Sequence, residues 1–80
     1  MELYLDKVFS EEDGLEIQEG KTAIINGSKE KILELCEFFE KVKKHMEQST
    51  YCHMQFRDYN QNWNKKEYID IEVNVPNQDQ

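Results

Sequence analysis

Three side chains of the types that bind metal ions lie close together in the sequence: His45, Cys52 and His53. Zinc needs three or four such side chains that converge on one point. If residues 51–57 form a strand, Cys52 and His53 point to opposite faces of it, because neighbouring strand residues alternate. We therefore predict that the chain has no metal site, and no motif in it indicates a cofactor.

Nucleophilic catalysis meets the same objection. Cys52 would be buried while its neighbour His53 faces outward, so the two cannot form a Cys-His pair. A Ser-His-Asp set can be written from Ser49, His53 and Asp70, but the glycine pattern of a nucleophile turn is missing. The chain also has no Gly-rich phosphate loop. The sequence predicts no catalytic residues and no enzyme.

A further group of side chains is typical of protein recognition, since tyrosine and arginine are enriched at interface hot spots. Strand alternation places most of this group, with Ile24 and Glu72, on one face of a predicted sheet, and Trp63 in a loop over residues 58–67. The predicted partner-binding residues are Tyr4, Asp6, Tyr51, His53, Gln55, Arg57, Trp63, Tyr68 and Asp70. A purely structural role stays open, because tyrosines also suit a solvated sheet face.

Two residue types have more specific alternatives. Trp63, the single tryptophan, either caps one end of the core or is an anchor presented to a partner. Cys36 and Cys52 are expected between helix and sheet, where thiols act as small buried apolar groups. Both would then react slowly with thiol reagents in the folded protein.

Five segments show the alternation of strands: residues 3–9, 15–18, 22–25, 51–57 and 68–75. Gly20 is predicted to form a hairpin turn between the second and third, and residues 10–14 a loop. The side chains expected to face the core are Leu15, Ile17, Ala23, Ile25, Cys52, Met54, Phe56, Ile69, Ile71, Val73 and Val75. Leu3 and Leu5 share one face of the first strand.

A helix is expected from the N-cap Ser28 to about Gln48. Its apolar stripe is formed by Ile32, Leu35, Phe39, Val42 and Met46, and is widened by Cys36 and Phe38. The opposite face carries the pairs Glu37 with Lys41 and Glu40 with Lys44. The chain is thus predicted to be α+β, an antiparallel sheet of about five strands in the order β-β-β-α-β-β, with one helix packed on one face. Residues 1–76 form a single domain, and residues 77–80 a disordered tail.

The charge distribution bears on partners. The chain carries 17 acidic and 10 basic side chains, a net charge of −7, and residues 1–20 alone hold seven acids and one base. Such a surface repels nucleic acid and attracts a basic protein, although the charge also serves solubility. The sequence has no apolar run long enough for a membrane span and no export signal. Two cysteines without a Cys-x-x-Cys spacing favour a cytoplasmic location.

Two stretches, residues 24–35 and His53-Met54-Gln55-Phe56, resemble the immunity protein 32 family of bacterial polymorphic toxin systems. The resemblance covers about residues 22–75: a strand leading into Gly27-Ser28, one amphipathic helix, and a His-containing strand. That family often has His-x-His on this strand, so Gln55 departs from the pattern. The resemblance implies a cognate toxin as partner, encoded by a neighbouring gene and neutralised by direct contact.

The expected function is therefore that of a non-catalytic, protein-binding immunity protein that neutralises a toxin with a basic surface. The alternative is a small homo-oligomeric structural protein, for example a homodimer, in which the open sheet face pairs with itself. Neither alternative involves nucleic acid or a membrane.

Overall fold

The computed structural model describes residues 1–12 and 16–77, and the side chains of residues 1–5 and 20–77. These residues form an α+β fold, with one α-helix and two separate antiparallel sheets of two strands each. One sheet, the arm, is formed by β1 (Glu2–Glu12) and β2 (Glu16–Asn26). The other belongs to the body, which comprises α1 (Lys29–Met46), β3 (Cys52–Gln55), the 3-10 helix η1 (Phe56–Asp58) and β4 (Glu72–Val75).

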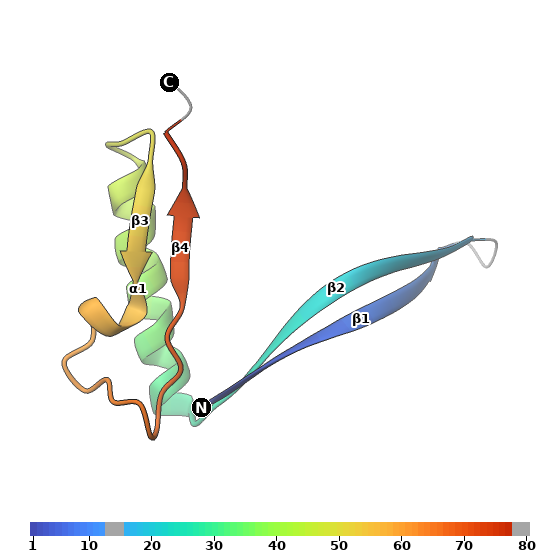
Figure 1. Ribbon diagram of the computed structural model, residues 1–80, viewed down its shortest axis with the longest axis horizontal. Coiled ribbons are helices and arrows are strands. Elements are labelled where there is room, and N and C mark those ends of the chain that lie inside the picture. The colour runs from blue at the N-terminus through green and yellow to red at the C-terminus, as the bar shows by residue number, and fades with distance from the viewer. Residues whose placement is uncertain (13–15, 78–80) are drawn as a thin grey trace.

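The arm projects from one end of the body, so the molecule is flat and L-shaped (Figure 1). Its extents are 47 × 38 × 17 Å and its radius of gyration is 16.1 Å. A compact chain of this length has a radius of gyration of about 12 Å. The projecting arm accounts for the difference.

The predicted five-strand sheet is wrong in two respects. The arm does not pair with β3 and β4, and the three predicted N-terminal strands are two long ones. Gly20 lies inside β2 opposite Val8, and the chain reverses between the paired residues Glu12 and Glu16. Gly20 resembled a turn residue locally, but the pairing continues past it because a strand also accommodates glycine. The predicted loop over residues 10–14 is partly in β1, and residues 13–15 lie outside the described part.

The helix begins and ends close to its predicted limits. The Ser28 hydroxyl accepts a hydrogen bond from the Lys31 amide at 3.3 Å, as expected of an N-cap. Leu35, Phe38 and Val42 are buried, whereas Phe39, predicted in the middle of the apolar stripe, is exposed. The reason is the width of the sheet, because two strands cover a narrower strip of helix than five strands would.

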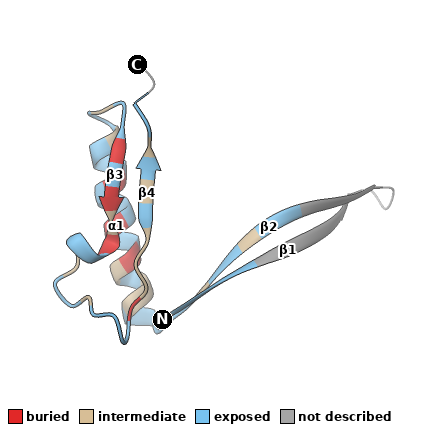
Figure 2. Ribbon diagram, in the orientation of Figure 1, coloured by how far each residue is buried: buried red, intermediate tan, exposed pale blue. Residues whose placement is uncertain are grey.

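The core lies between α1 and β3 (Figure 2). Cys52, Met54 and Phe56 point inward in alternation, as predicted. The Phe38 and Phe56 rings lie 5.7 Å apart, and the Phe56 and Tyr68 rings 6.1 Å apart. Of the residues whose side chains are described, seven are buried in this core: Leu35, Phe38, Val42, Cys52, Met54, Phe56 and Tyr68.

The last strand is shorter than predicted. It begins at Glu72, and there Val73 and Val75 are half-buried while Glu72 and Asn74 are exposed, as alternation requires. Residues 68–71 pack against the body without strand geometry. Most of the predicted tail, residues 78–80, lies outside the described part. Among the described helices none is both long and apolar enough to cross a membrane.

Candidate protein-binding surface

The helix covers one face of the β3–β4 sheet, and the other face is open. Because Cys52 and Met54 point toward the helix, His53 and Gln55 point outward. Six of the described side chains contact one another on this open surface, which we call the polar face: His53, Gln55, Arg57, Asp70, Glu72 and Asn74.

The Glu72 carboxylate is the centre of a hydrogen-bond network on the polar face. It accepts from Gln55 Nε2 at 3.3 Å and from Asn74 Nδ2 at 2.9 Å. His53 Nε2 lies 3.4 Å from the same carboxylate, and His53 Nδ1 lies 2.6 Å from Asn74 Oδ1. Cross-strand pairs of this kind each contribute roughly 0.2–1 kcal/mol. The β3 and β4 side chains are therefore linked to one another across the surface.

Arg57 and Asp70 extend the network beyond β3. The Arg57 Nε atom lies 3.5 Å from Asp70 Oδ2, and its Nη2 atom donates to Gln55 Oε1 at 3.3 Å. Asp70 Oδ1 accepts from the backbone amides of Arg57 and Ile71, both at 3.0 Å. With one guanidinium and two carboxylates, the polar face complements a partner that carries hydrogen-bond donors and positive charge.

Tyr51 lies at the end of the polar face and is 53% exposed. Its ring is edge-on to His45 at 6.4 Å, and His45 Nε2 lies 2.9 Å from the Tyr51 carbonyl oxygen. The tyrosine thus packs against His45 of the helix. It borders a hollow of about 440 Å³, which is lined by Tyr51, Cys52, His53, Asn74, Val75, Pro76 and Asn77.

The structure brings five of the predicted partner-binding residues together on or beside the polar face: Tyr51, His53, Gln55, Arg57 and Asp70. It does not bring the other four there. Tyr4 is on the arm, on a separate sheet, and is 50% exposed. Asp6 is also on β1, and its side chain is outside the described part.

Tyr68 was placed wrongly on the open face, since it is buried in the core at 9% exposure. The strand does not extend back to it, so alternation does not apply. Trp63 is half-buried, packs against the core and donates from Nε1 to the Ile69 carbonyl at 2.8 Å. These contacts are those of a residue that caps one end of the core.

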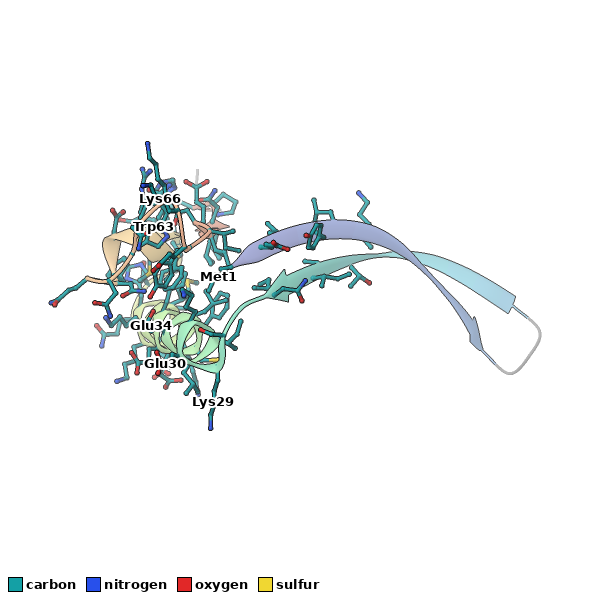
Figure 3. The ribbon with its side chains drawn as sticks, turned by 90° about the horizontal axis from the view of Figure 1, so that it is seen from below. Met1, Lys29, Glu30, Glu34, Trp63 and Lys66 are labelled. Carbon is teal, nitrogen blue, oxygen red and sulfur yellow. The ribbon has the colours of Figure 1, made fainter. Side chains whose placement is uncertain are left out.

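Glu34 has a role that the sequence prediction missed. Its carboxylate accepts from Asn60 Nδ2 at 3.0 Å and Asn62 Nδ2 at 3.1 Å, and also from the Tyr68 hydroxyl. The Tyr68 and asparagine hydrogen bonds lower the pKa of Glu34, and the bond to Glu34 raises the pKa of Tyr68. Figure 3 shows Glu34 on the helix beneath the loop that carries Trp63. The sequence did offer one indication of this contact, the several asparagines around Trp63, because asparagine side chains order a loop by hydrogen bonding.

The arm exposes apolar side chains that the sequence prediction assigned to a covered sheet. Leu3 is 43% and Leu5 79% exposed, and Ala23, expected in the core, is exposed as well. Of the described side chains on β1 and β2, only Ile25, at the base of the arm, packs against the core. The inward positions predicted for Leu15 and Ile17 lie outside the described side chains. On the helix, Cys36 is exposed, so its predicted burial is wrong, whereas Cys52 is buried as expected.

Within the described residues, no group of three His, Cys, Asp or Glu side chains is placed to hold a metal ion. Comparison with known proteins gives no matching family model, curated protein or solved structure. The resemblance to the immunity protein 32 family therefore stays a prediction from the residues alone.

Proposed function

We propose that the chain is a non-catalytic protein-binding module of the bacterial cytoplasm that neutralises a cognate toxin by direct contact. The observation that supports it best is the polar face, whose six side chains are linked by hydrogen bonds and by the Arg57–Asp70 ion pair and remain accessible to a partner. A surface ordered before binding loses little side-chain entropy on association. The toxin as partner comes from the sequence resemblance.

Tyr51 is the proposed centre of affinity. It is a large, half-exposed aromatic side chain that contacts His45 at the edge of a hollow, and tyrosine is one of the residue types enriched at interface hot spots. His53 and Gln55 would supply hydrogen bonds beside it. Acidic residues 11–13 add long-range attraction to a basic toxin through their charge.

The test measures binding to the toxin domain encoded next to this gene. Tyr51→Ala should weaken the complex by about tenfold or more, mainly through faster dissociation, because central desolvated contacts set the residence time. Neutral replacements of residues 11–13 should mainly slow association and reduce its dependence on salt. Leu33→Ala is the control, since Leu33 is an exposed apolar residue on the helix, away from the polar face.

Two results would contradict this proposal. One is a neighbouring gene product that neither binds the chain nor is toxic without it. The other is a complex that tolerates Tyr51→Ala and His53→Ala but is lost on replacement of Trp63 in a folded variant, which would move the site to the loop over residues 58–67.

A further inference from the structure

The arm exposes apolar side chains on both of its faces. Register pairs Leu3 with Ile25 and Leu5 with Ala23, so these residues share one face, whereas Tyr4 and Ile24 share the other. Leu3, Tyr4, Leu5 and Ile24 are all exposed large apolar residues. An isolated two-stranded hairpin is only marginally stable in water. Such an arm is stabilised when another surface pairs with it.

The body has an unpaired strand edge of matching type. The Phe56 amide donates to the Ile71 carbonyl at 2.9 Å, so the backbone groups of Ile71 point toward β3. In an antiparallel pair every second residue points the same way, so the other odd-numbered residues of this segment also bond to β3. Alternation then directs the backbone N–H and C=O groups of Glu72 and Asn74 away from β3. Among the described strands, none pairs with this outer edge of β4. An exposed edge of this kind is a template for a strand of another chain.

The flank of α1 beside β4 is also uncovered. Glu34, Lys41 and His45 contact the loop and β3 segments, and helical periodicity puts Phe39 on the opposite flank. Phe39 is 41% exposed there, and the exposed Lys43 follows it by one helical turn. Figure 1 shows that the outer edge of β4 faces the side on which the arm projects.

We propose that two copies of this chain exchange arms, so that the arm of each copy adds as a third and fourth strand to the outer edge of β4 in the other. Met1 and Ile25 pack against the core at the base of the arm, and the Met1 amino group donates to the Glu67 carbonyl at 2.8 Å. Figure 3 shows Met1 at this junction. These contacts hold the arm away from its own β4, whereas a two-fold axis lets each copy supply one arm and one edge.

The size of the contact predicts a reversible dimer. An 18-residue helix is about 27 Å long, and a two-stranded ribbon laid along it is about 10 Å wide. Two exchanged arms would then bury on the order of 1,000 Å² over both copies, near the lower limit for a specific interface. The polar face stays open in this dimer, so the inference does not depend on the toxin.

The experiment is sedimentation velocity of the full chain over a concentration series. The wild type should pass from monomer to dimer. Asn74→Pro removes an outward N–H and should raise the dimer dissociation constant about tenfold or more. Asn74→Ala is its matched control, because it loses the same side chain but keeps the N–H. Trp63 fluorescence checks that each variant is folded, and Glu72→Pro with Glu72→Ala repeats the test if Asn74→Pro unfolds.

A second pair of variants tests the arm. Leu5→Lys should weaken the dimer about tenfold or more, because it removes apolar contact and adds charge beside Lys43. Leu33→Lys makes the same exchange at an exposed position on the far side of the helix and should leave the dimer unchanged. In hydrogen exchange, the amides of Glu72 and Asn74 should become slower in the dimer.

Three outcomes would overturn the proposal. The first is a wild type that stays monomeric throughout the series. The second is a dimer disrupted by Leu5→Lys but not by either proline variant, because the arms would then pair with each other. The third is a dimer lost on Tyr51→Ala or His53→Ala, which would place the contact on the polar face.

Discussion

The arm and the body differ in how strand length relates to burial. β1 and β2 have 11 residues each, yet the large apolar side chains described on them are mostly exposed. β3 and β4 have four residues each, yet β3 contributes two residues to the core. The difference is the helix, which covers one face of β3–β4, whereas among the described side chains of the arm only Ile25 packs against the core. Strand pairing gives shape, whereas stability comes from apolar surface removed from water.

The largest expected effect comes from opening the core of the body. Phe38→Ala should lower the free energy of unfolding by about 3–5 kcal/mol, because Phe38 is fully buried among Phe39, Phe56 and Tyr59. Urea unfolding followed by Trp63 fluorescence measures it. Leu5→Ala should change the free energy of unfolding by only about 0.5 kcal/mol or less, when both variants are measured at a protein concentration at which the chain is monomeric. Equal losses in the two variants would show that the arm packs on the body.

A smaller effect is expected where the loop is attached to the helix. The hydrogen bonds that lower the pKa of Glu34 stabilise the fold above the unfolded-state pKa of glutamate, and this contribution is lost as the pH falls through the folded-state pKa. Glu34→Gln should therefore cost about 1 kcal/mol at neutral pH. Its unfolding curve should converge with that of the wild type in acid.

Glu37→Gln is the matched control for this prediction, because Glu37 is exposed on the outer side of the same helix. It should leave both the stability and its pH dependence nearly unchanged. A Glu34→Gln variant that differs from the wild type equally at all pH values would contradict the assigned role of the carboxylate.

The smallest expected effect on stability concerns the thiols. Cys36 is exposed and Cys52 is buried, so a thiol reagent should label one site rapidly in the folded protein and both sites in denaturant. Mass spectrometry of the labelled peptides identifies the sites. Cys36→Ser should remove the fast phase while changing the free energy of unfolding by about 0.5 kcal/mol or less. A fast phase at Cys52 would mean that the β3–helix contact opens readily.

Local signals in the sequence determined two elements of the body, the helix and β3. The Ser28 cap, the spacing of Leu35 and Val42, and the alternation of Cys52, Met54 and Phe56 each depend on a few neighbouring residues, and the structure confirms them. Four of the candidate site residues, Tyr51, His53, Gln55 and Arg57, come from alternation over residues 51–57, which the structure has as a strand at Cys52–Gln55. Asp70 came from a predicted strand that does not extend back to it, and it reaches the polar face through its contacts with Arg57. Most of the polar face is thus readable from the chain, although Asn74 was not among the predicted residues.

Only the tertiary structure decided which strands share a sheet and which apolar residues are covered. Alternation states which residues lie on the same face of a strand, but it does not state what lies against that face. Leu5 and Met54 look alike in the sequence, and Cys36 looks as suitable for burial as Cys52. Met54 and Cys52 are buried because the helix packs on β3, whereas Leu5 and Cys36 are exposed because no described segment reaches them.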